Sequence, residues 1–235
     1  MSIESARYGD EFMVDELHEI HKIETKIEDA MWTSVQDDDY EHALKVYETT
    51  KTDLESIEPV NEEIERERKR VLSYCLMRIN DALVRLERSE DSVDRAEEVL
   101  RIALSSEDRV QILRAKMALG VALMNQGRLD EAESHFTEII KQTQDETDDK
   151  DVIQVYGWTL IVRVNILLGK SLYNQARELT NQALGVLGGI DNYAGLRTTY
   201  SLLSQLSQIE GDSKKSDLYR KKSEDYAELA KEHRQ

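Results

Sequence analysis

Two acidic stretches have the residue types and spacing that could support metal chemistry. The runs Asp37-Asp38-Asp39 and Asp148-Asp149-x-Asp151 resemble carboxylate sets that hold Mg²⁺ for a diphosphate in all-helical enzymes. Both runs fall where one predicted helix ends and the next begins, and aspartates at that position cap helix N-termini and favour the positive end of the helix dipole. We therefore expect helix caps or solvated turns there. A Mg²⁺-dependent helical enzyme is the remote alternative.

A pair of histidines offers a second candidate metal site. His18 and His21 share one face of a predicted helix, with Asp15 and Glu24 nearby. The catalytic zinc helix instead spaces its histidines four apart around a glutamate, so a solvated or docking face is the favoured interpretation. The order of residues contains no nucleophile–base grouping and no Gly-rich phosphate loop. We expect no enzyme activity, no metal and no cofactor.

The composition indicates an all-helical, acidic protein. Its 235 residues include one proline and ten glycines, 34% are charged, and the β-branched residues are scattered rather than gathered into strands. The formal net charge of −17 argues against nucleic-acid binding, which needs clustered Lys and Arg. The charge indicates a highly soluble acidic protein, and the alternative is an acidic surface that recruits a basic segment of a partner protein.

The remaining composition signals concern the compartment. Cys75 is the single cysteine and has apolar neighbours, which predicts a buried thiol. The first ten residues lack the basic and apolar regions of a signal peptide. The apolar run 158–168 is interrupted by Arg163 and Asn165 and is too short to span a bilayer. We therefore expect a cytoplasmic protein without membrane insertion.

Apolar spacing and helix breakers predict ten helices joined by short turns. They cover residues 14–36, 39–57, 60–88, 92–105, 108–126, 129–145, 149–169, 172–187, 193–210 and 213–232. Because no low-complexity linker interrupts them, we expect one domain over residues 1–235. Its antiparallel helix pairs are 16–57, 60–105, 108–145, 149–187 and 193–232. Small residues such as Ala43, Ala96, Ala132 and Ala176 near the start of each second helix would allow close packing.

The third pair carries the most specific motif. It contains Leu119-Gly120-x-x-Leu123 followed by Gly127-Arg-Leu-Asp-Glu-Ala132-x-x-x-Phe136. This pattern resembles the tetratricopeptide repeat, most clearly over residues 113–146, and the other pairs resemble it as divergent copies. The resemblance implies an all-α solenoid of about five antiparallel helix pairs wound as a right-handed superhelix. It also implies a scaffold or adaptor that binds partners.

In this family the first helices of the pairs line a concave groove that binds peptides. The groove residues that the resemblance implies are Arg114, Met117, Ala118, Val121, Met124 and Asn125 from the third pair and Thr198, Ser201, Leu202, Gln205 and Gln208 from the fifth. Amides can pair with a peptide backbone, and methionine adapts to varied side chains. The alternative is that these residues pack against neighbouring helices or simply face water. Of the basic and amide residues that clamp acidic chaperone tails in some members, only Arg114 is present. We therefore expect a basic or apolar peptide.

These observations favour a non-enzymatic adaptor that binds a peptide or a helix of a partner protein in the groove. The alternative is a self-associating assembly protein that dimerises through its N-terminal helix. That helix carries a wide apolar stripe, which would be an exposed patch if nothing covered it. The stripe consists of Phe12, Val14, Leu17, Ile20, Ile23 and Ile27.

Overall fold

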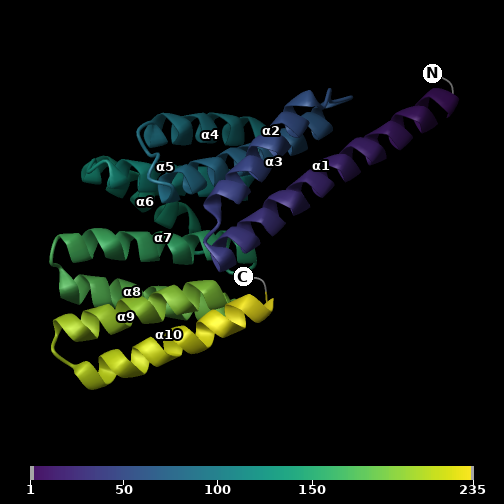
Figure 1. Cartoon of the computed structure of the whole chain (residues 1–235). Helices are drawn as coiled ribbons and strands as arrows, with labels where there is room; N and C mark the ends of the chain where they lie inside the picture. Colours follow the sequence, from purple (N-terminus) through teal and green to yellow (C-terminus); the bar gives the residue numbers. More distant parts are fainter. Residues whose placement is uncertain (1–2, 234–235) are drawn as a thin grey trace. The chain divides into compact units, whose positions relative to one another are not determined.

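The computed structural model describes residues 3–233, with side chains from residue 15 onward. Within these limits the chain forms ten α-helices and no strand, and successive helices within each compact unit run antiparallel (Figure 1). The helices are α1 (Ile3–Asp37), α2 (Tyr40–Ser56), α3 (Glu62–Arg85), α4 (Ser92–Ser106), α5 (Arg109–Asn125), α6 (Leu129–Thr143), α7 (Lys150–Gly169), α8 (Tyr173–Gly189), α9 (Tyr193–Ile209) and α10 (Ser213–His233). The all-α prediction is confirmed. Nine helices match the predicted bounds to within three residues, whereas α1 begins at Ile3 rather than at residue 14.

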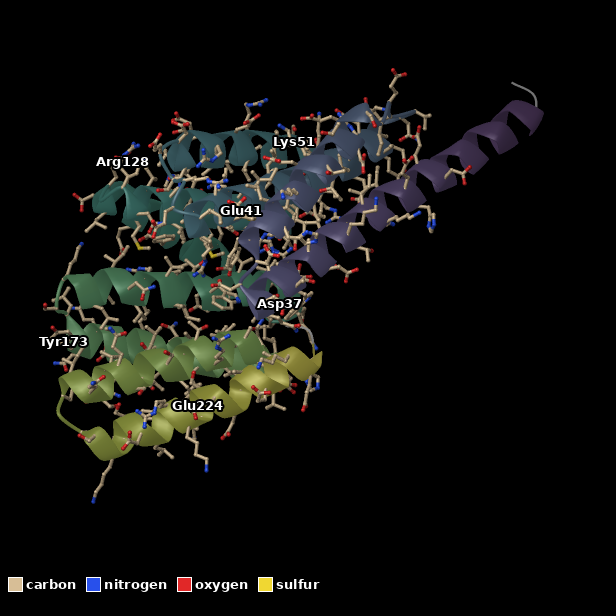
Figure 2. The ribbon with its side chains drawn as sticks, in the orientation of Figure 1. Asp37, Glu41, Lys51, Arg128, Tyr173 and Glu224 are labelled. Carbon is tan, nitrogen blue, oxygen red and sulfur yellow. The ribbon has the colours of Figure 1, made fainter. Side chains whose placement is uncertain are left out.

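Aspartate and asparagine side chains start several of the helices. Oδ1 of Asp39 accepts a hydrogen bond from the backbone N–H of His42 at 3.0 Å, in the turn between α1 and α2 where Figure 2 labels Asp37 and Glu41. Asp149 caps α7 by accepting from the N–H groups of Asp151 and Val152. Both acidic runs therefore supply helix caps, as predicted, because these carboxylates satisfy N–H groups that have no partner within the helix.

The helices divide into two compact units, and the boundary falls inside α5. Unit 1 spans Met1–Ala122 and unit 2 spans Leu123–Gln235. Each unit has its own hydrophobic core. The expectation of one continuous domain over all 235 residues stays a prediction.

The core of unit 1 lies between α1, α2 and α3. Ile20, Ile23 and Ile27 of α1 are buried in it, and Leu17 packs against it. This part of the apolar stripe is therefore covered within unit 1 and is not available for a dimer. The side chains of Phe12 and Val14, which complete the stripe, lie outside the described residues.

The core of unit 2 is built around α7 and α8. By length and composition α7 is apolar enough to cross a membrane, but half of that stretch is buried inside the protein, as in the core helix of a soluble domain. The apolar run is thus longer than the residues 158–168 expected from the sequence. Two glycines allow the helices of this core to pack closely. Gly157 of α7 and Gly195 of α9 both face the fully buried side chain of Leu187 on α8.

Candidate functional site

A polar stripe runs along α3, beside the residues that this helix buries. Arg70, Tyr74, Arg78, Asp81 and Arg85 recur every three or four residues, so they share one side of the helix. Each of them keeps part of its surface in contact with solvent. This side of α3 faces α1, which packs directly against it. The stripe therefore presents arginines and a tyrosine next to the side chains of α1.

An ion-pair cluster joins α1 and α3 at one end of the stripe. Arg70 donates to both carboxylate oxygens of Glu24, at 2.8 and 2.6 Å, and through Nε to Glu67 at 2.8 Å. The hydrogen bonds from Arg70 hold the pKa of Glu67 below its ordinary value, and Glu67 in turn raises the pKa of Arg70. The cluster fixes the position of α1 on α3 through charge-assisted, bidentate contacts.

The same cluster contains the only candidate metal-binding group found among the described residues. Ligand atoms of His21, Glu24 and Glu67 lie within 4.8 Å of one another, and His21 Nε2 is 3.0 Å from Glu67 Oε1. The guanidinium of Arg70 already supplies the positive charge between the two carboxylates. A cation would have to displace it. His18, the other member of the predicted histidine pair, is exposed and lies outside this group.

Next along the stripe, Tyr74 and Arg78 surround a methionine of α1. Tyr74 Oη donates to Met31 Sδ at 3.7 Å, and Arg78 Nη1 lies 3.4 Å from the same sulfur. The guanidinium carbon of Arg78 is 5.3 Å from the centre of the Tyr74 ring, a cation–π distance. The thioether of Met31, the ring of Tyr74 and the guanidinium of Arg78 therefore lie together at the contact between α1 and α3.

Arg78 has more hydrogen-bonding capacity than its neighbours use. Its side chain is 23% exposed, and its one carboxylate contact joins Nη2 to Asp81 at 3.2 Å. The Nε–H is buried without an acceptor among the described residues. A guanidinium has five N–H donors, so this arginine retains donors that an acceptor on a ligand could engage.

Arg114 of α5 lies within electrostatic range of Glu28 and Tyr74. Burial raises the pKa values of both Glu28 and Tyr74, and the positive charge of Arg114 partly offsets each increase. Glu24 and Asp29 add to the upward shift at Glu28 because like charges disfavour its ionisation. We call the surface made by Glu28, Met31, Tyr74, Arg78 and Arg114 the Tyr74 face.

The predicted groove residues of α5 lie along one helix. Ala118 and Tyr74 both pack against a small core formed by Met77, Val99, Ala103 and Ala115. Met117, Val121 and Met124 are half-buried, and Asn125 is exposed at the C-terminal end of α5. Of the predicted groove residues, Arg114 acts electrostatically on Tyr74, and Ala118 packs against the same small core as Tyr74.

The predicted groove residues of α9 belong to unit 2. Ser201, Gln205 and Gln208 are exposed, and Thr198 is half-buried with its hydroxyl donating to the carbonyl of Ala194. Leu202 differs from the prediction, since only 8% of it is exposed and it packs in the core of unit 2. Its place on the apolar side of α9, one turn before Leu206, accounts for this burial.

Sequence reasoning missed Met31, Tyr74, Arg78 and Asp81. The signal was present in α3, where Arg70, Tyr74 and Arg78 follow one another at intervals of four residues. The apolar spacing that predicted a helix over residues 60–88 indicated only the side of this helix that is buried. Met31 carried no signal of its own, because its role depends on the approach of α1 to α3.

An open polar cleft adjoins the ion-pair cluster in unit 1. Its volume is about 440 Å³, and charged side chains make up most of its lining. The lining residues are Leu17, Glu63, Arg66, Glu67, Arg70, Ser106, Glu107 and Asp108. Pockets for small molecules are predominantly apolar with few polar groups, so this cleft is a poor match for a substrate or cofactor site.

Comparisons with known proteins give similarity in structure but not in sequence. No protein-family model matches the chain, and no curated protein matches it. Among solved structures, the Rap conjugation gene regulator of plasmid pLS20 in complex with the Phr* peptide aligns over 99% of this chain with a TM-score of 0.64 and 18% identity. The aligned part is 57% of that regulator.

Two further structures are similar over nearly their whole lengths. BtubC (BKLC) from P. vanneervenii has a TM-score of 0.56 and 14% identity, with 90% of this chain and 91% of that chain covered. A Podosopora anserina protein described as a kinesin light chain with nearly identical TPR-like repeats has a TM-score of 0.55 and 12% identity, with 92% and 98% covered. Identities this low carry information about the fold alone. The chain has a divergent tetratricopeptide-like repeat fold.

Proposed function

We propose that this protein is a non-enzymatic adaptor that binds a peptide or a helix of a partner protein on the Tyr74 face. Because the face carries two arginines and one glutamate, an apolar segment suits it better than a basic one. Met31 and Tyr74 supply adaptable and aromatic contact area, while Glu28 supplies negative charge. The cytoplasmic location expected from the sequence stays part of this proposal.

The proposal rests mainly on the contacts and the unused hydrogen-bond donors of Arg78. It lies against an aromatic ring and a thioether with one carboxylate contact, and its buried Nε–H has no acceptor among the described residues. The Arg78 side chain is 23% exposed and has one carboxylate contact for its five N–H donors, so the exposed part of the guanidinium can donate to a carbonyl oxygen of an incoming segment. Peptide backbones supply such oxygens at regular spacing, whereas the side chains around them would contact Met31 and Tyr74.

The similarity to solved structures supports the same class of function. The pLS20 regulator, which shares this fold over almost the entire chain, was solved with a bound peptide. Helical-repeat folds of this type present extended surfaces to partners. The charged cleft beside Arg70 and the capping role of both aspartate runs offer little support for a catalytic alternative.

Selection of peptide ligands from a random library tests the proposal. The full chain is immobilised and used to select from a library of random 12-residue peptides displayed on phage. The recovered sequences are then synthesised with a fluorescent label, and their Kd values are measured by anisotropy. Tyr74→Ala and Arg78→Ala should each weaken binding by about tenfold or more, as expected when an aromatic or arginine hot spot is truncated.

A matched substitution separates loss of the site from general effects. Arg101→Ala also removes an arginine from unit 1, but the Arg101 side chain is 73% exposed and forms only a long contact with Glu98. It should leave Kd within about twofold. Circular dichroism melts test whether each variant folds. If Arg78→Ala does not fold, Arg78→Gln takes its place. Peptides that bind both Tyr74-face variants as tightly as wild type would overturn the proposal.

A further inference from the structure

The helix α10 packs along α9 with one side only. Tyr226 stacks on Tyr200 with ring centroids 5.4 Å apart, and the tilted ring of Tyr219 lies 6.1 Å from Tyr200. The hydroxyl of Ser223 donates to the carbonyl of Arg197 at 2.9 Å. Ala230 is the one buried residue of the helix. These residues identify the inner side of α10.

Lysines surround an exposed leucine away from that inner side. Lys214, Leu218 and Lys221 follow one another at intervals of four and three residues, so they share the outer side of α10. Leu218 is 53% exposed. Lys215 and Lys222 flank this row, and we call the five residues the lysine face.

Little of the positive charge on the lysine face is neutralised within the protein. Lys215 pairs with Asp212 at 3.0 Å, and the Lys222 ammonium lies 4.9 Å from the centre of the Tyr200 ring. Within the part of the chain that the structure describes, Lys214 and Lys221 form no ion pair. Two lysines flanking an exposed leucine are therefore available to carboxylates from outside.

The lysine face stands out against the charge of the whole chain. Residues 213–222 hold five cations and one carboxylate, whereas the protein has a net charge of −17. The positive end of the α10 dipole adds to the local potential. The basic stretch ends before Glu224, which Figure 2 labels on α10.

We propose that the lysine face docks an acidic segment of a partner protein that carries an apolar side chain between its carboxylates. Lys214 and Lys221 are seven residues apart on one helix, or about 10 Å along its axis. Two carboxylates seven residues apart on a partner helix match this separation. An apolar residue midway between them on the same side would contact Leu218.

The charge and apolar area favour a short protein segment over a larger polyanion. A chain with a net charge of −17 is repelled by nucleic acid and by anionic membranes in proportion to their charge. A protein segment with few carboxylates is repelled less than either of these polyanions. Insertion into a membrane interface needs a continuous apolar face, and α10 offers only Leu218 on its outer side. The lysine face shares no residue with the Tyr74 face, so this proposal does not rest on the proposed function.

A synthetic helical peptide tests the docking directly. The probe is a fluorescein-labelled 15-residue peptide with two glutamates seven residues apart and one leucine between them on the same face. Its binding to the full chain is measured by anisotropy in 50 mM and 300 mM NaCl. We expect wild type to bind and the affinity to fall at the higher salt concentration. The double variant Lys214→Glu/Lys221→Glu should bind about tenfold more weakly or worse.

The control variant reverses the charge of two other lysines in unit 2. Lys141 of α6 and Lys170 at the end of α7 are both exposed, so Lys141→Glu/Lys170→Glu changes the net charge equally. It should leave Kd within about twofold, and Leu218→Ser should weaken binding in low salt. Equal loss in both double variants, or no binding by wild type, would overturn the proposal.

Two other occupants of the lysine face are tested in parallel. Flotation with phosphatidylcholine vesicles containing phosphatidylserine reports binding to an anionic membrane. Light scattering over a range of concentrations reports association with a second copy. Either activity, if present in wild type and lost in Lys214→Glu/Lys221→Glu while the peptide fails to bind, assigns the face to that occupant and overturns the proposal.

Discussion

Gly157 of α7 lies against Leu187 of α8 so closely that a Cβ atom on Gly157 would be 2.5 Å from Cδ2 of the leucine. Leu187 is fully buried, so its side chain has little room to move. Gly157→Ala should therefore overpack the core of unit 2 and reduce the free energy of unfolding by about 1–3 kcal/mol. Urea denaturation followed by circular dichroism measures the change.

Gly185 provides the matched control in the adjacent helix. A Cβ at that position would meet no atom within 4 Å. Gly185→Ala should leave stability unchanged or raise it by up to about 1 kcal/mol, because alanine loses less backbone entropy on helix formation than glycine. If both alanine variants were equally stable, the close approach of α7 and α8 would not constrain residue 157.

Ala132 of α6 is fully buried in unit 2, as are its counterparts Ala96 in α4 and Ala176 in α8 in their own units. Ala132→Leu adds three carbons where no space exists and should lower Tm by several degrees, corresponding to about 1–3 kcal/mol. Thr137→Leu, at an exposed position of the same helix, should leave Tm nearly unchanged. An unchanged Tm for the alanine variant would exclude a packing role.

Arg70 joins Glu24 and Glu67, and all three side chains are less than a quarter exposed. Arg70→Gln leaves two carboxylates close together without their cation and should destabilise unit 1 by about 2 kcal/mol. Arg101→Gln, at an exposed pair, should cost well under 1 kcal/mol. Equal stability of the two variants would show that the cluster contributes nothing.

The difference in unfolding free energy between wild type and Arg70→Gln should depend on pH in a defined way. Arg70 lowers the pKa of Glu67 in the folded state, so its contribution is present above the unfolded pKa and is lost as pH falls through the folded pKa. The difference in stability between wild type and Arg70→Gln should therefore be constant near neutral pH. It should shrink once the solution becomes more acidic than the ordinary pKa of glutamate, 4.5. A difference that grows with acid would contradict this assignment.

Cys75 should be unreactive in the folded protein. Its thiol is fully buried between α2 and α3, donates to the carbonyl of Tyr47 at 3.2 Å, and has its pKa raised by burial to about 11. Because the thiolate is the nucleophile, Ellman's reagent at pH 8 should react only as fast as the protein unfolds. Addition of guanidinium chloride should release one thiol per chain. Rapid reaction without denaturant would contradict the burial.

Local sequence rules were sufficient for nine of the described helices and their ends, whereas α1 begins at Ile3 rather than at residue 14. Apolar periodicity located all ten helices, Asp39 and Asp149 cap the helices expected of them, and Gly127 takes the positive φ that its turn requires. The burial of Ala132 also followed from its position in the repeat motif. These features depend on residues within a few positions of one another, which is why one sequence determined them.

Only the tertiary structure decided which surfaces are covered and which polar groups meet. Periodicity identified the apolar stripe of α1, but not that α2 and α3 cover Ile20, Ile23 and Ile27. It placed Leu202 on α9 without revealing that the core of unit 2 buries it. The meeting of Met31 with Tyr74 and Arg78 joins residues more than forty positions apart. Such contacts depend on how helices pack, and packing is set by many side chains at once rather than by any local pattern.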